Sequence, residues 1–338
     1  MLIINETDKS LYKNVWVTAE LTAAKIQPVT YELIGAARRL ADIRGSEVWV
    51  LLMGPETGVQ PDSLYAAGAD TVISVVDAAL ADFQDEIEAN VLVRLIDKYK
   101  PEIIITGATT RGRALIPRVA VLAECGLTAD CTQLDIDRDN GDLLQTRPAF
   151  GGNILATIRC TNHRPQLATV RPRVMKAPEP DTSRSGRLLI EKLQPLDFIL
   201  RKHILETVHS SDSAINLADA RIIISGGRGV GGPEGFKLLQ RLADRVGGAV
   251  GASRAAVDAG WIPYTHQIGQ TGQTVQTKVY VACGISGQIQ HLVGMQACDL
   301  IIAIDKQTDT PMMQLADIAI VGDLFEIIPE LINEIPRL

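Results

Sequence analysis

A chain of 338 residues is longer than the usual single hydrophobic core, so its length predicts two domains. With 46% hydrophobic and 22% charged residues the composition is typical of a globular protein, and a net charge of −7 argues against a nucleic-acid partner, because phosphate binding needs a surplus of Lys and Arg. No hydrophobic run is long enough for membrane insertion, the first residues do not resemble a signal peptide, and five cysteines without a C-x-x-C pair favour a reducing cytoplasm over a disulfide framework.

The first half of the chain alternates short apolar runs with helical patterns. Strands are predicted at residues 15–17, 48–53, 71–76 and 103–106. Helices are predicted between and after them, at residues 29–44, 61–67, 87–99 and 113–125. Such alternation is typical of βαβ units, so we expect an α/β domain built on a parallel sheet.

Beyond Gly126 the pattern changes to short extended runs separated by polar turns. Four strands are predicted there, at residues 133–137, 143–148, 154–160 and 166–171. We expect them to form an antiparallel extension of the first domain. Asp135, Asp137 and Asp139 indicate a hairpin turn rather than a calcium loop, because the Gly and Glu that close a calcium loop are missing.

A polar segment with several prolines begins near residue 175. Its composition predicts a linker over about residues 175–205, since proline ends regular structure. The linker divides the chain into an N-terminal α/β domain, residues 1–203, and a C-terminal doubly wound domain, residues 204–338.

The C-terminal domain opens with an apolar strand, a glycine-rich loop and a helical pattern. The loop, Ser225-Gly-Gly-Arg-Gly-Val-Gly-Gly, lies where the first βα turn of a doubly wound fold binds phosphate. Three of its glycines fit G-x-G-x-x-G, which alone is weak evidence. Gly247-Gly248 stands where a nicotinamide dinucleotide site has an acidic residue about 20 positions later, so a plain NAD site is not expected.

Polar residues also follow the later apolar strands of this domain. Because the carboxyl ends of parallel strands meet at one edge of a sheet, we expect these residues to converge on one long ligand. Helix N-termini after residues 232, 286 and 323 would suit a pyrophosphate. The converging residues are Arg228, Ser253, Arg254, Ser286, His291, Asp305 and Asp323.

Four motifs along this edge resemble the alpha subunits of electron-transfer flavoproteins: Ser225-Gly-Gly-Arg-Gly, Val250-Gly-Ala-Ser-Arg-Ala, Gln267-Ile-Gly-Gln-Thr-Gly and Gly284-Ile-Ser-Gly-Gln-Ile-Gln-His. The resemblance covers the whole chain and includes Thr109-Thr-Arg-Gly-Arg and Arg147-Pro-Ala-Phe-Gly-Gly-Asn in the first domain. It implies an FAD cofactor held mainly by the second domain. It also implies a heterodimer with a beta subunit that carries its own FAD or AMP.

The resemblance implies roles for four residues around the flavin ring. Arg254 lies near the N5 edge and favours the reduced, anionic flavin, while His291 donates a hydrogen bond near N1 and the C2 carbonyl. Thr271 gives its hydroxyl to the N5 side, and Gln270 contacts the ring or the ribityl chain. The structural alternatives are a surface Arg, a structural His and a loop held by its own side-chain bonds.

The same resemblance extends the site along the rest of the cofactor. Arg228 neutralises the phosphates or braces its loop, and Asp323 and Leu324 contact the adenosine portion. Asp305 stands where the family often has Asn, and its carboxylate accepts from ribose hydroxyls but cannot donate. The residues implied along the remaining path are Ser253, Ile268, Gly269, Ser286, Gly287, Gln288, Ile289 and Gln290.

Nothing in the sequence resembles a set of residues for acid–base or nucleophilic catalysis, and Cys283, Met312 and Met313 are expected in the core. This pattern fits an electron carrier, whose chemistry belongs to its cofactor. Residues 261–269 resemble the bifurcating members of the family. Those members take electrons from NADH and deliver them to an acyl-CoA dehydrogenase and to ferredoxin or flavodoxin.

Three alternatives stay open. The first is a non-bifurcating flavoprotein that relays electrons from dehydrogenases to a membrane quinone reductase. The others are a nicotinamide-dependent enzyme on the same sheet and a nucleotide-binding regulatory module without redox work. The predicted linker adds the hypothesis that the FAD domain swings between electron donor and acceptor.

Overall fold

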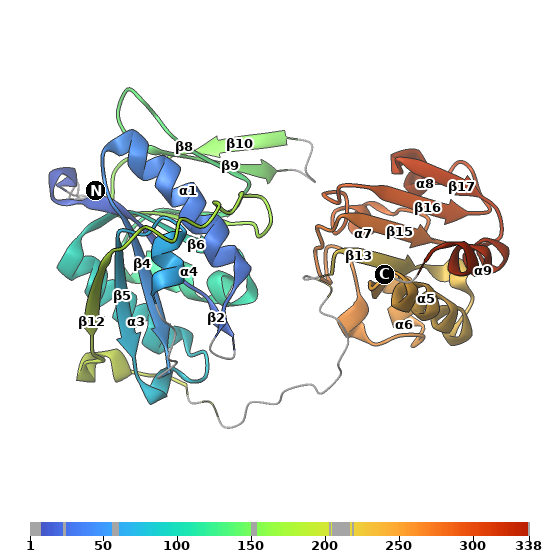
Figure 1. Ribbon diagram of the computed structural model, residues 1–338, viewed down its shortest axis with the longest axis horizontal. Coiled ribbons are helices and arrows are strands. Elements are labelled where there is room, and N and C mark those ends of the chain that lie inside the picture. Colours follow the sequence, from blue (N-terminus) through green and yellow to red (C-terminus); the bar gives the residue numbers. More distant parts are fainter. Residues whose placement is uncertain are drawn as a thin grey trace, which may run out of the picture. The chain divides into compact units, whose positions relative to one another are not determined.

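The chain divides into two compact units, Met1–Val208 and His209–Leu338 (Figure 1). The structure is a computed structural model that describes residues 8–22, 25–55, 61–149, 154–202, 204, 217 and 220–336. Both units have an α/β fold, as predicted. The domain boundary at residue 203 or 204 stays a prediction.

The first unit is built on a seven-stranded sheet in which every neighbouring pair is parallel. Its strands, in spatial order, are β12 (Arg187–Glu191), β5 (Thr71–Val76), β4 (Val48–Gly54), β1 (Lys13–Thr18), β6 (Pro101–Gly107), β11 (Gln166–Val170) and β7 (Leu127–Cys131). Successive strand residues point to opposite faces, so Val15 and Val17 enter one core while Trp16 enters the other.

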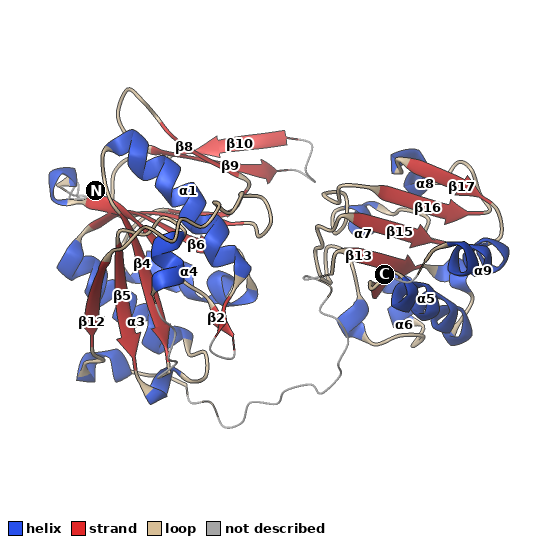
Figure 2. Cartoon of the chain, viewed as in Figure 1, coloured by secondary structure: helices blue, strands red, loops and turns tan. Residues whose placement is uncertain are grey.

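Helices cover both faces of this sheet (Figure 2). On one face lies α1 (Pro28–Arg44), and on the other lie α3 (Asp85–Tyr99) and α4 (Thr110–Leu122). Helix α1 begins with a proline at its first position and ends at Gly45, which adopts a left-handed φ of 62°. The remaining helix and 3-10 turns are α2 (Asp62–Ala66), η1 (Lys9–Leu11), η2 (Ala78–Leu80) and η4 (Pro195–Phe198).

The antiparallel extension contains only three of the four predicted strands: β8 (Gln133–Ile136), β9 (Leu143–Ala149) and β10 (Ile154–Ile158). The fourth prediction is wrong about direction, because β11 lies parallel between β6 and β7 in the main sheet. The predicted hairpin turn is confirmed, with the Asp137 carboxylate accepting from the Asp139 N–H at 3.0 Å. A short antiparallel pair, β2 (Leu21–Thr22) and β3 (Lys25–Ile26), completes the unit.

The linker predicted over about residues 175–205 is wrong for its middle part. Residues 187–191 form β12, which pairs with β5, and the Arg94 guanidinium binds the Asp197 carboxylate of η4 at 3.0 Å. The apolar run of β12 extends the sheet, and proline begins the η4 turn that follows. The rest of the predicted linker, and Phe150–Asn153 of the first-domain motif, include residues outside the described ranges.

The second unit holds a five-stranded parallel sheet with the order β14 (Ala249–Ala252), β13 (Ile222–Gly226), β15 (Val279–Cys283), β16 (Ile301–Asp305) and β17 (Ile318–Val321). In chain order this is 2-1-3-4-5, so the connections leave β13 in opposite directions. Such a sheet has a crevice outside the carboxyl ends of its first and third strands, which here are β13 and β15.

Two cores lie on opposite faces of this second sheet. The longest helix, α5 (Pro233–Arg245), buries one face through Phe236, Leu239 and Leu242, which recur every three residues. Cys283, Met312 and Met313 are buried, as predicted. The other helix and 3-10 elements are α6 (Arg254–Asp258), α7 (Ile289–Leu292), α8 (Pro311–Leu315), α9 (Leu324–Glu334), η5 (Arg228–Val230) and η6 (Tyr264–His266).

Within the described residues, no helix combines the length and the hydrophobicity that crossing a bilayer requires.

Candidate cofactor-binding site

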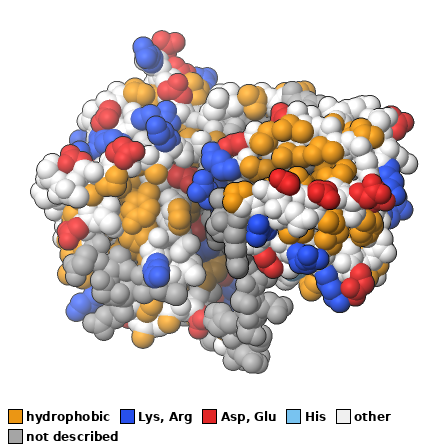
Figure 3. All heavy atoms as spheres, turned by 45° about the vertical axis from the view of Figure 1, so that its right-hand side comes forward, with side chains coloured by type: hydrophobic (Ala, Val, Ile, Leu, Met, Phe, Trp, Pro, Cys, Tyr) orange, Lys and Arg blue, Asp and Glu red, His pale blue; other side chains and the backbone are white. Residues whose placement is uncertain are grey.

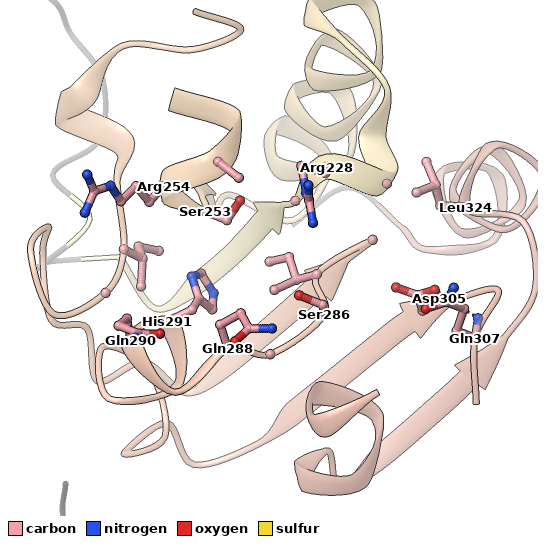
Figure 4. Close-up of a pocket in the computed structure, with 18 of the residues that line it drawn as sticks. Arg228, Ser253, Arg254, Ser286, Gln288, Gln290, His291, Asp305, Gln307 and Leu324 are labelled. Atoms are coloured by element: carbon pink, nitrogen blue, oxygen red, sulfur yellow. Dashed lines mark hydrogen bonds between the residues drawn. The ribbon is translucent and has the colours of Figure 1, made fainter. Parts of the chain in front are cut away.

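A cavity of about 670 Å³ lies at the carboxyl ends of the strands of the second unit (Figure 4). Every predicted site residue between Arg228 and Leu324 lines it, with the exception of Ile289, which is exposed on α7. Residues distant in sequence therefore gather at the switch point of the sheet, where the topology favours a ligand. Their contact with a cofactor stays a prediction.

Two loops in direct backbone contact form one wall of the cavity. The Gly229 N–H of η5 donates to the Gly284 carbonyl at 3.0 Å, and the Gly227 N–H donates to the Cys283 carbonyl at 2.9 Å. A Cβ on Gly229 would lie 2.7 Å from the Gly284 Cα, closer than carbon atoms approach. Glycine is required here because the loops after β13 and β15 pack backbone to backbone.

Helix N-termini reach the cavity at fewer places than expected. The lining includes the first residues of α6 and α9, and Gln290 and His291 of α7, but no residue of α5. The position expected after residue 232 therefore does not line this cavity, whereas η5, which precedes α5, contributes Arg228 and Gly229 to the lining. The expected positions after residues 286 and 323 do line it.

His291 is the most deeply buried polar side chain of the lining after Gln267, with 7% of its surface exposed. Its Nε2 lies 2.9 Å from the Tyr280 hydroxyl, and Nδ1 is buried without a partner at hydrogen-bonding geometry among the described residues. Burial lowers the pKa of His291 to about 4, against a smaller opposite effect of the nearby Ile268 backbone. The imidazole is therefore neutral at pH 7 and offers a directional hydrogen bond rather than a charge.

The cations of the lining are held to different degrees. Arg254 Nε lies 3.2 Å from Asp258 Oδ2, but both side chains are mostly exposed, at 67% and 62%, so the ion pair is weak. Lys306 Nζ lies 2.9 Å from Asp323 Oδ2, and this hydrogen bond lowers the pKa of the Asp323 carboxyl. The Arg228 side chain makes no ion pair or hydrogen bond to another described residue and lines the cavity, so its charge is available to a ligand.

The loop between η6 and β15 forms the opposite wall, close to the start of α7. The Gln270 N–H donates to the Gln290 carbonyl at 2.7 Å, and a Cβ on Gly269 would lie 2.7 Å from that same carbonyl oxygen. Gly269 also has a φ of 143°, which other residues rarely adopt. The loop is thereby fixed beside His291.

The sequence did not single out several lining residues, among them Gln267, Lys306 and Gln307. Each is within three residues of a predicted site residue, so its position after a strand or within a motif was the available signal. The sequence could not indicate the direction of these side chains, because that direction depends on contacts made across the cavity.

The residues present fit a dinucleotide. Ser253 Oγ, like His291 Nδ1, is buried with no hydrogen-bond partner among the described residues, as expected of groups that bind a ligand. Backbone walls let a phosphate chain approach closely, and the volume lies within the range of roughly 300–1,000 Å³ typical of cofactor sites.

Comparison with known proteins agrees with this reading of the site. The family model of the electron transfer flavoprotein domain matches residues 15–195, and that of the electron transfer flavoprotein FAD-binding domain matches residues 216–296. The chain is an electron-transfer flavoprotein alpha subunit by family. The second match includes the loops that carry Arg228, Arg254 and His291, and the cofactor of this family's site is FAD.

Relatives align along nearly their full length. The electron transfer flavoprotein subunit alpha of Thermoanaerobacterium thermosaccharolyticum is 49% identical over 97% of this chain and 99% of its own length. That of Clostridium acetobutylicum is 45% identical over 97% and 98%. The acryloyl-CoA reductase electron transfer subunit beta of Anaerotignum propionicum is 39% identical over 99% and 98%. These matches give no support to the nicotinamide-dependent or regulatory alternatives.

Proposed function

We propose that this chain is the FAD-carrying alpha subunit of a bifurcating electron-transfer flavoprotein. In this role it pairs with a beta subunit that oxidises NADH and reduces ferredoxin or flavodoxin. The alpha subunit passes electrons singly to an acyl-CoA dehydrogenase. The observation that carries the electron-transfer role is the cavity at the switch point, which is lined by the family's motif residues. Bifurcation is supported by residues 261–269 and by the relative named as an acryloyl-CoA reductase electron transfer subunit.

The described side chains suit the binding and tuning of FAD. Bound FAD supplies the one- and two-electron chemistry that amino-acid side chains lack. Arg228 is free to pair with a phosphate, and the Asp305 carboxylate can accept hydrogen bonds from hydroxyls. His291 contributes a hydrogen bond without charge, whereas Arg254 contributes a permanent positive charge.

Exposed hydrophobic side chains support a protein partner. Figure 3 shows such side chains on the visible face of each unit. In the first unit Ile154 and Leu155 of β10 are exposed, and in the second unit Ile318 and Val321 of β17 are exposed. Apolar surface of this kind often marks a subunit interface, which fits the proposed beta subunit.

The decisive experiment is cofactor counting on the heterodimer purified with its beta subunit. Two FAD per heterodimer are expected, together with NADH-dependent reduction of an acyl-CoA dehydrogenase that stops when ferredoxin or flavodoxin is left out. One FAD and one AMP, with electron delivery that needs no NADH, would favour the simple carrier that serves a membrane quinone reductase. A heterodimer without flavin absorbance would overturn the whole proposal.

We further propose that the FAD-binding unit changes position relative to the first unit during transfer. The separate cores of the two units support this, because each unit can then move as a rigid body. Chemical cross-links between the units should slow transfer to the acceptor more than reduction of the FAD by the donor. Unchanged transfer to every acceptor after cross-linking would exclude the motion.

A further inference from the structure

The loop of residues 268–273 holds Thr271 firmly by its backbone. The Tyr264 hydroxyl donates to the Thr271 carbonyl at 2.5 Å, and the Gln273 N–H donates to the Gln267 carbonyl at 2.7 Å. The Gln270 N–H is bonded to the Gln290 carbonyl next to α7. The backbone position of Thr271 at the cavity is therefore set, and the direction of its hydroxyl hydrogen depends on the partners of its side chain.

Gln267 sets that direction. It is only 2% exposed, pairs with Ala252 at the end of β14, and lines the same cavity as Thr271. Its Nε2 lies 3.0 Å from Thr271 Oγ1. Because an amide nitrogen only donates, the hydroxyl oxygen accepts this bond and its own hydrogen must point elsewhere.

We propose that Gln267 is a positioning residue that orients the Thr271 hydroxyl so that it donates a hydrogen bond to FAD in the cavity. The proposal rests on the FAD-binding function of this site. Reduction places negative charge on the flavin ring, and a donor fixed toward an acceptor of that ring interacts more strongly with the reduced form. Gln267 therefore raises the reduction potential of the FAD through Thr271.

The chain offers variants that separate direction from presence of the hydrogen bond. Gln267→Met removes the donor and keeps the length of the side chain. Gln267→Glu replaces the donor by an acceptor, so that the Thr271 hydroxyl must turn toward residue 267. Both variants should lower the reduction potential and raise the FAD dissociation constant, roughly three- to tenfold for one hydrogen bond. If Gln267→Met folds poorly, Gln267→Asn takes its place. It keeps the amide but shortens its reach, so it should lower the potential and weaken FAD binding in the same way.

A double-mutant cycle tests whether Gln267 acts through Thr271. Thr271→Val removes the hydroxyl, whereas Thr271→Ser retains it and should stay close to the wild type. In the Thr271→Val background, Gln267→Met should have no further effect on the potential or on FAD affinity. Additive effects would overturn the proposal, since a merely structural Gln267 acts independently of the hydroxyl.

Gln273→Met is the matched control. The Gln273 amide lies in the same loop but donates to the Thr265 carbonyl at 2.7 Å rather than to Thr271 Oγ1. Its loss should leave the reduction potential unchanged, and an equal fall in potential would overturn the proposed specificity of Gln267. A wild-type heterodimer without FAD would overturn the proposed function and this inference together. A wild type that binds FAD, with additive effects of Gln267→Met and Thr271→Val, would overturn the inference alone.

Discussion

His291 and Arg254 offer a cofactor different kinds of interaction. The imidazole is buried and neutral at pH 7, so it contributes a hydrogen bond whose strength depends on direction. The guanidinium is permanently charged but exposed and close to Asp258, so water, salt and that carboxylate weaken its field. The hydrogen bond of His291 should be insensitive to ionic strength, whereas the effect of the Arg254 charge should weaken as salt is added.

The burial of His291 predicts a pH dependence for the stability of the second unit without cofactor. Its folded pKa of about 4 lies below the ordinary value of 6.5, so the unfolded chain binds the proton more readily between these values. Stability should fall as the pH falls through this window, by about 3 kcal/mol when complete. Chemical denaturation at pH 7.5 and 4.5 measures this fall in the free energy of unfolding. His291→Gln should remove the part of the fall that comes from protonation of the imidazole. An equal loss in both proteins would contradict the neutral, buried imidazole.

Arg254 predicts a salt-dependent potential. Arg254→Gln should lower the one-electron reduction potential of the bound FAD by roughly 40 mV, the equivalent of about 1 kcal/mol for an exposed charge. Arg254→Lys keeps the charge and should lose less. The difference between Arg254→Gln and the wild type should shrink as salt is raised from 0.05 to about 0.5 M, since the Debye length shortens. A difference that persists at high salt would indicate a direct hydrogen bond instead.

At the scale of elements, the site depends on the contact between the loops that follow β13 and β15. Gly229→Ala places a methyl group 2.7 Å from the Gly284 Cα, so the loops must separate. We expect a loss of about 1–3 kcal/mol in stability and a loss of FAD from the purified protein.

Gly231→Ala provides the control for that prediction. Gly231 has a φ of 76° but no atom within 4 Å of its added methyl group, so the substitution costs about 1 kcal/mol in backbone strain and leaves the loop contact intact. FAD content after gel filtration and thermal unfolding compare the two variants. Equal FAD loss in both would show that backbone strain, not loop contact, controls the site.

The elements that the sequence predicted and those that it missed differ in how far their partners lie along the chain. The strands β1, β4, β5 and β6 follow each other through predicted helices, and their apolar runs indicated a parallel sheet. The apolar pattern of β11 is equally compatible with either direction, and its pairing of Gln166 with Ile103 joins residues 63 positions apart. Strand direction here was decided by distant contacts, so local pattern predicted the strand but not its sheet.

At the scale of the whole molecule, each unit has its own pair of cores. The first unit packs around residues such as Leu33 and Leu92, and the second around Tyr280 and Leu239. Separate cores predict separate unfolding transitions, because each unit buries its own apolar surface.

Calorimetry of the chain should therefore show two transitions, and FAD should shift only that of the second unit. At 100 times its dissociation constant, FAD should stabilise that unit by about 2.7 kcal/mol. Leu92→Ala and Leu239→Ala, which remove fully buried side chains from one unit each, assign the two transitions. A single transition that moves as a whole with FAD would show that the units unfold as one.

The sequence by itself determined the two α/β units, the glycine loop after β13 and most of the residues around the cavity, because strand ends and glycines are local features with a fixed place in a doubly wound fold. Only the tertiary structure decided that β11 and β12 join the main sheet, that α5 stays outside the lining and that Gln267 turns its amide to Thr271. These features depend on partners that packing brings together from distant parts of the chain. The neutral state of His291 likewise depends on its burial, which is a property of the folded surroundings rather than of the residue.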